Sequence, residues 1–82
     1  MEILKNPTTI KLLSQQIIIA CDEYLSLRLS EQKLKELLFY YATNHGNKLF
    51  KGPNFNPTVL NRIGKKRAEL IEHTLSGFQI RL

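Results

Sequence analysis

Apolar residues recur every three or four positions through residues 10–27, which is the spacing of one face of an α-helix. No part of the chain shows the strand-length alternation of apolar and polar residues that is typical of a half-buried strand. The sequence therefore predicts an all-α fold whose first helix spans about residues 7–28. The expected buried face consists of Ile10, Leu13, Ile17, Ala20, Tyr24 and Leu27.

The tripeptide Asn-Pro-Thr occurs at residues 6–8 and again at residues 56–58. An asparagine side chain can accept a hydrogen bond from a first-turn amide, and proline loses nothing at the first helical position by lacking an N–H group. Each copy therefore predicts the start of a helix. We expect the second copy to begin a helix that ends near Ser76, with Gly77 as its stop.

A helix over residues 31–44 is expected between these two. Ser30 is suited to cap its start, and Gly46 is suited to end it in a left-handed conformation. Residues 47–55 are then an ordered loop that fills the core between the second and third helices with Leu49, Phe50 and Phe55. The sequence thus predicts a small three-helix bundle, with residues 1–82 forming a single helical domain.

Length and composition argue against an enzyme and against a metal protein. A chain of 82 residues buries only a small core, in which a deep pocket would be costly. Its one cysteine, Cys21, excludes an internal disulfide and a multi-cysteine zinc site, and we expect a buried, unreactive thiol there. His45 and His73 lack a third ligand, so no metal site is expected. No carboxylate dyad, phosphate-binding glycine loop or catalytic triad is present, so we expect no catalytic residues and no cofactor.

The N-terminus does not have the pattern of a secretory signal peptide, which is a basic segment followed by an apolar run. The longest apolar run, residues 17–21, is far shorter than a membrane span. We therefore expect a cytoplasmic protein without a membrane partner.

All of the net positive charge lies in residues 46–68. This stretch has six basic residues and no acidic one, whereas the first 45 residues are balanced and the whole chain has a formal net charge of +5. Concentrated charge creates a local potential that attracts anions, and nucleic acid is the commonest large anion. The candidate nucleic-acid-binding residues are Lys48, Lys51, Arg62, Lys65, Lys66 and Arg67. Tyr40 and Tyr41 are candidate platforms for stacking bases.

Residues 62–71 resemble the second half of a helix–hairpin–helix motif, in which a glycine hairpin holds a DNA phosphate on its backbone amides. The matching positions are Ile63, Gly64, Ala68 and Ile71. Arg62, however, stands where that motif has its first hairpin glycine. The apolar spacing continues through Gly64, which favours one uninterrupted helix; a break at Gly64 stays the open alternative. In an uninterrupted helix, Gly64 would mark the close approach of the first helix.

Four short segments, at residues 35–38, 48–52, 55–59 and 63–67, form a pattern that spans most of the chain. The pattern resembles that of a family of short uncharacterised proteins of Bacillus-type bacteria and their prophages. The resemblance implies a bacterial or phage protein of the cytosol. Small phage proteins often bind and redirect a host protein.

Two functions from different classes follow. The first is a small, non-enzymatic accessory or regulatory protein that binds DNA or RNA through phosphate contacts on a basic loop–helix surface. The second is a protein-interaction module, either a homodimer or a modulator of a host protein, that uses the apolar faces of the first two helices. A third interpretation of the basic stretch is a solvated helix face without a partner.

Overall fold

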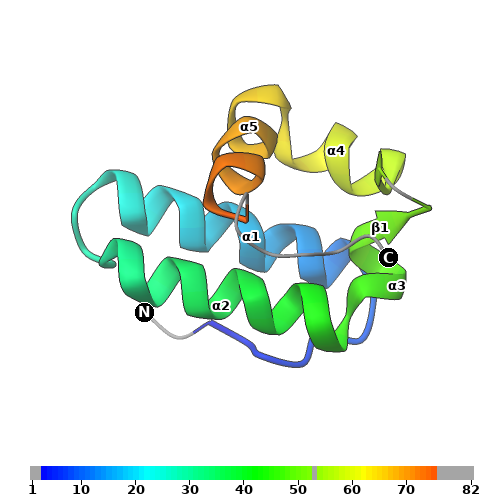
Figure 1. Cartoon of the computed structure of the whole chain (residues 1–82), viewed down its shortest axis with the longest axis horizontal. Helices are drawn as coiled ribbons and strands as arrows, with labels where there is room; N and C mark the ends of the chain where they lie inside the picture. Colours follow the sequence, from blue (N-terminus) through cyan, green and yellow to red (C-terminus); the bar gives the residue numbers. More distant parts are fainter. Residues whose placement is uncertain (1–2, 53, 76–82) are drawn as a thin grey trace.

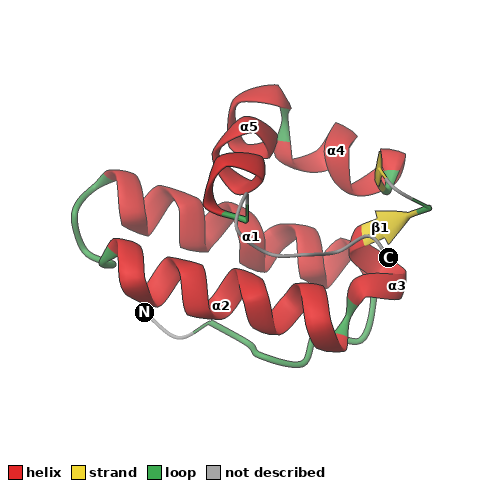
Figure 2. Ribbon diagram, in the orientation of Figure 1, coloured by secondary structure: helices red, strands yellow, loops and turns green. Residues whose placement is uncertain are grey.

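The computed structural model describes residues 3–52 and 54–75, and this part of the chain is mainly helical (Figures 1 and 2). Two long helices, α1 and α2, lie side by side in antiparallel directions, and α4 and α5 lie across α1. A short helix, α3, and a small antiparallel hairpin connect α2 to α4. The elements are α1 (Ile10–Leu25), α2 (Glu31–Asn44), α3 (Gly46–Leu49), β1 (Phe50–Lys51), β2 (Asn54–Phe55), α4 (Pro57–Ile63) and α5 (Lys65–Thr74). The all-α class is thus broadly confirmed, whereas the described residues form five helices and a two-stranded sheet in place of the three helices expected.

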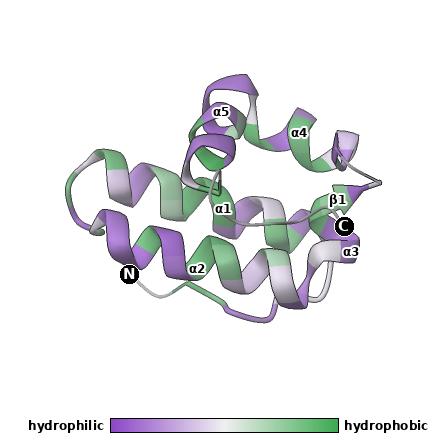
Figure 3. Ribbon diagram, in the orientation of Figure 1, coloured by the Kyte–Doolittle hydropathy of each residue, from purple (hydrophilic) through white to green (hydrophobic). Residues whose placement is uncertain are grey.

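The core of the described residues is organised around α1. Its buried side chains pack against those of α2 and α4, and Tyr41 of α2 is fully buried among them. Figure 3 shows hydrophilic residues predominating along α5, which lies across the more apolar α1. No helix in residues 3–52 and 54–75 has the length and apolarity needed to cross a membrane.

The first helix begins later than the Asn-Pro-Thr tripeptide predicts. Thr9 is its N-cap, with its side-chain oxygen accepting a hydrogen bond from the Leu12 amide at 3.0 Å. Asn6 instead accepts a hydrogen bond from the Tyr40 hydroxyl at 3.0 Å, and Pro7 is buried. The expected start was therefore wrong, because the tertiary contact of Asn6 with α2 takes the side chain that would have capped the helix.

The second helix has the predicted bounds and the predicted cap. The Ser30 side chain accepts a hydrogen bond from the Lys33 amide at 3.2 Å. The role expected of Gly46 was wrong, because His45 caps α2 and Gly46 begins α3 with an ordinary negative φ. The apolar loop prediction is confirmed in its packing: Leu49 is buried, and the rings of Phe50 and Phe55 stack 5.6 Å apart in a small hairpin.

The third helix is broken at Gly64, so the expected uninterrupted helix is wrong. Gly64 has φ 87° and ψ 162°, a conformation that is essentially restricted to glycine. Apart from its two chain neighbours, a Cβ atom added to Gly64 would have no heavy atom within 4 Å, so close packing against α1 does not explain this glycine either. Glycine is explained by its backbone conformation, which turns the chain between Ile63, where α4 ends, and Lys65, where α5 begins. The predicted stop at Gly77 lies outside the described residues.

The end of α1 has an unusual residue in its turn. The Arg28 and Leu27 amides donate to the carbonyls of Glu23 and Tyr24, which is the hydrogen-bond pattern of a Schellman motif. The left-handed position of that motif normally holds glycine, but here it holds Leu27, with φ 68°. Leu27 is also 92% exposed, so its side chain gains little from packing within the chain.

Replacing Leu27 with glycine should therefore raise the free energy of unfolding by about 1 kcal/mol, because glycine relieves the left-handed strain without the loss of a buried contact. Urea denaturation of both proteins measures this change. A lower stability of the glycine variant would show that the Leu27 side chain packs in the folded protein.

Candidate nucleic-acid interface

Three exposed cations surround the break between α4 and α5. Arg62 lies in the last turn of α4, and Lys65 and Lys66 lie in the first turn of α5. None of the three has a carboxylate within 4.0 Å in the part of the chain that the structure describes. We call these three residues the basic corner.

The start of α5 makes the basic corner more positive. The cap residue, Gly64, provides no side-chain acceptor for the first-turn amides, and no acidic residue lies in the first turn. A helix N-terminus carries a partial positive charge, so Lys65 and Lys66 stand where cations are disfavoured by about 0.3–1 kcal/mol each. The arrangement costs stability, and it creates a surface that attracts anions.

Arg67, unlike the three residues of the basic corner, is paired with an acidic residue. Its guanidinium binds both carboxylate oxygens of Asp22, at 3.0 and 3.1 Å, and donates to the Ile63 carbonyl at 3.1 Å. These bonds tie the end of α4 and the start of α5 to α1. Arg67 thus holds the basic corner in place while its own charge is matched by Asp22.

Lys48 and Lys51 lie at the other end of α4, on α3 and β1 (Figure 1). Lys51 is exposed and Lys48 is half-buried. Because α4 has seven residues, about 10 Å of helix separates these lysines from the basic corner. That length corresponds to about three nucleotides along one strand. The structure therefore brings three of the six predicted residues together, whereas Lys48 and Lys51 lie on the elements before α4.

Sequence reasoning gave no signal for Asp22, because 45 residues separate it from its partner Arg67. It also gave Tyr41, together with Tyr40, as a candidate platform for stacking bases, and the structure contradicts this for Tyr41. Tyr41 is fully buried and its hydroxyl donates to the Leu4 carbonyl, so no base can reach its ring. Tyr40 is only partly buried, with its hydroxyl held by Asn6.

Cys21 is buried in the core, as predicted. Burial raises the pKa of its thiol to about 11, with a smaller lowering by Arg67 and a smaller raising by Asp22. Burial also raises the pKa of the Tyr41 hydroxyl. Within residues 3–52 and 54–75, no three His, Cys, Asp or Glu side chains gather closely enough to hold a metal ion.

The raised pKa of Cys21 should make the protein less stable in alkali. The unfolded thiol, with a pKa near its ordinary value of 9.0, loses its proton before the folded thiol does. The free energy of unfolding should therefore fall between about pH 9 and pH 11, by up to about 1.4 kcal/mol per pH unit from this group. Urea denaturation across this range should show a shallower decline in Cys21→Ala. An equal decline in both proteins would exclude Cys21 as its source.

Residues 4–76 match the model of a protein family described as a conserved hypothetical protein. No curated protein and no solved structure matches the chain. The expectation of a family of uncharacterised proteins is thus confirmed.

Proposed function

We propose that the chain, which belongs to the family described as a conserved hypothetical protein, is a small non-enzymatic protein that binds nucleic acid. The observation that carries the proposal is the basic corner, where Arg62, Lys65 and Lys66 meet at an uncapped helix start. The proposal places the protein in the cytoplasm. An origin in Bacillus-type bacteria or their prophages stays a prediction.

In the proposed complex a backbone phosphate lies at the start of α5. The uncapped first-turn amides of the helix donate hydrogen bonds to it, and the Lys65 and Lys66 side chains supply its counter-charge. Arg62 approaches the same phosphate or the next one from the end of α4. Lys51 and Lys48 contact the strand about three nucleotides away. Because these are phosphate contacts, they give binding without strong sequence preference.

The break at Gly64 supports this arrangement. An uninterrupted helix would satisfy the amides of residues 65–67 internally and leave only side chains for an anion. The observed break leaves those amides outside the helical ladder and without a side-chain cap, beside three cations. The helix–hairpin–helix resemblance predicts the same use of backbone amides after a glycine, although Arg62 replaces the first glycine of that motif.

A fluorescence anisotropy titration tests the proposal. A labelled DNA duplex of about 20 base pairs and a labelled single-stranded RNA serve as probes, each at low and at physiological salt. We expect saturable binding of at least one probe at low salt and a large loss of affinity at the higher salt. Absence of binding to both probes at low salt would refute the proposal.

A protein-interaction module is the second candidate, and the α1–α2 turn favours it. The faces of α1 and α2 expected to bind a partner are largely used by the core, which leaves Leu25 and Leu27 exposed at the turn, at 65% and 92%. A strained and exposed leucine is typical of a residue selected for an external contact. Light scattering after size-exclusion chromatography tests self-association: a dimer that Leu27→Gly converts to a monomer would support this candidate. A monomeric wild-type protein would exclude the homodimer.

A further inference from the structure

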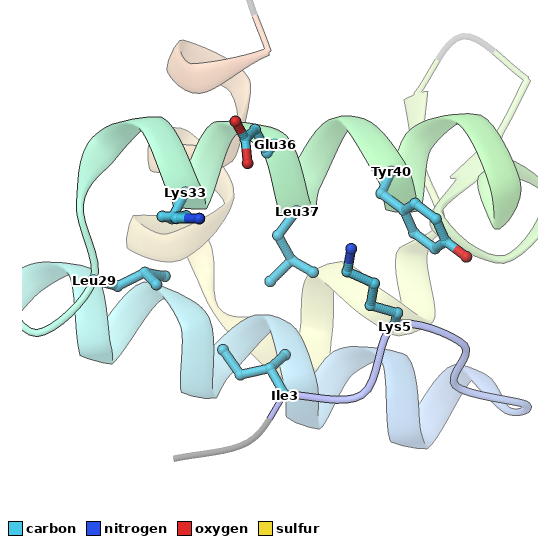
Figure 4. Close-up of a pocket in the computed structure, with 7 residues that line it drawn as sticks. All are labelled: Ile3, Lys5, Leu29, Lys33, Glu36, Leu37 and Tyr40. Atoms are coloured by element: carbon cyan, nitrogen blue, oxygen red, sulfur yellow. The ribbon is translucent and has the colours of Figure 1, made fainter.

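A groove lies between the N-terminal segment and α2, on the side of the α1–α2 pair away from α4 (Figures 1 and 4). Its volume is about 280 Å³, just below the size range of ordinary ligand pockets. Apolar side chains from three segments line it: Ile3 of the N-terminal segment, Leu29 of the α1–α2 turn and Leu37 of α2. The groove therefore offers an apolar surface to a ligand of about ten non-hydrogen atoms.

Among the described residues that line the groove, the charged ones are two lysines and one glutamate. Figure 4 shows Lys5 and Lys33 on either side of Leu37, with their amino groups turned toward it. Neither lysine has a carboxylate within 4.0 Å among the described residues. Glu36, at the rim, accepts a hydrogen bond from Gln32 at 3.1 Å. The two lysines therefore flank the apolar surface, and the charges of the described residues that line the groove sum to a positive value.

The position of Lys5 is supported by an aromatic ring. Its amino group lies 5.2 Å from the centre of the Tyr40 ring, within the range of a cation–π contact. The Tyr40 hydroxyl in turn donates to Asn6, which also contacts His45 at 3.2 Å. The amino group of Lys5, an exposed residue, is therefore drawn toward the groove by its contact with α2.

We propose that this groove binds a small amphipathic carboxylate, whose hydrocarbon part lies on Ile3, Leu29 and Leu37 and whose carboxylate lies between Lys5 and Lys33. Charge complementarity selects an anion over a neutral or cationic ligand. The apolar surface selects a ligand with a hydrocarbon part over a simple ion. Because the groove and the basic corner lie on different sides of the α1–α2 pair, this proposal stands independently of nucleic-acid binding.

A titration monitored by the ¹H–¹⁵N correlation spectrum of the full chain tests the proposal. Octanoate is the probe, octan-1-ol lacks its charge and acetate lacks its chain. We expect octanoate to shift the amides of residues 3–5 and 29–40 with a dissociation constant of about 1 mM or tighter. Octan-1-ol should bind about five-fold more weakly, and acetate should give no saturable shift. Shifts that stay linear with octanoate concentration, or that fall outside the groove, would overturn the proposal.

Three single substitutions test the direction in which each charge changes the affinity for octanoate. Lys33→Gln should weaken octanoate binding about three- to five-fold, as loss of one exposed ion pair predicts. Glu36→Gln should strengthen binding, because it removes the repelling charge. Lys11→Gln, an exposed site on α1 outside the groove, should leave binding unchanged. Equal effects of the two lysine substitutions, or weaker binding by Glu36→Gln, would contradict the assignment of the site.

Discussion

Alanine in place of Gly64 should lower the free energy of unfolding by about 2–3 kcal/mol, because an L side chain is strongly disfavoured at φ 87° and ψ 162°. For a domain of this size that loss lowers the melting temperature by roughly 10–20 °C. No clash beyond the two chain neighbours contributes, since a Cβ atom there would have no other heavy atom within 4 Å. Thermal denaturation monitored by circular dichroism measures the change.

Gly46→Ala is the matched control. Gly46 lies in α3 without a positive φ, and an added Cβ atom would approach Phe50 only to an ordinary 3.9 Å. We expect a change of at most about 1 kcal/mol, in the stabilising direction, because alanine favours a helix. Equal stabilities of the two alanine variants would show that glycine is not required at residue 64 and that the break has another cause.

Reversal of the three charges of the basic corner should abolish nucleic-acid binding, with a loss of affinity of about 100-fold or more at low salt. The variant is Arg62→Glu, Lys65→Glu and Lys66→Glu. Its fold should change little, because glutamate at residues 65 and 66 interacts favourably with the start of α5, which offsets the loss of a favourable cation at Arg62 in the last turn of α4. Loss of binding together with equal or higher stability would separate a binding role from a structural one.

The matched control reverses three exposed lysines elsewhere and so changes the net charge equally. Its substitutions are Lys11→Glu, Lys33→Glu and Lys35→Glu. We expect only a moderate loss of affinity, because these lysines lie on α1 and α2, away from the α4–α5 break. Equal losses in the two triple variants would show that net charge, and not the basic corner, attracts the nucleic acid.

Features that depend on neighbouring residues were predictable from the sequence. The Ser30 cap and the start of α2 followed from local capping rules, and so did the N-cap of α4 at Asn56, whose side chain accepts from the Thr58 amide at 2.9 Å. The Asn-Pro-Thr tripeptide at residues 56–58 predicted a helix start correctly, whereas the one at residues 6–8 did not. The difference is tertiary, because Tyr40 engages the side chain of Asn6.

The break at Gly64 could not be read from apolar spacing. Ile63 and Ile71 are both buried, so the spacing expected of one helix is kept although two helices present these residues to the core. The candidate site was likewise predictable only in those features that depend on the local sequence. Charge density along the chain located the basic corner. Only the fold shows that Arg67 forms an ion pair with Asp22. The fold also shows that α4 separates Lys48 and Lys51 from the other cations.

The salt dependence of DNA binding tests the central claim most directly. Anisotropy titrations over a series of salt concentrations give the slope of log K against log[salt], which is about −0.9 for each phosphate neutralised on duplex DNA. If the basic corner neutralises the one or two phosphates of the proposed complex, its Gln variant (Arg62→Gln, Lys65→Gln and Lys66→Gln) should bind with a slope shallower by about 0.9–1.8 than the wild-type protein. Equal slopes for the two proteins would contradict the account, because the basic corner would then contact no phosphate.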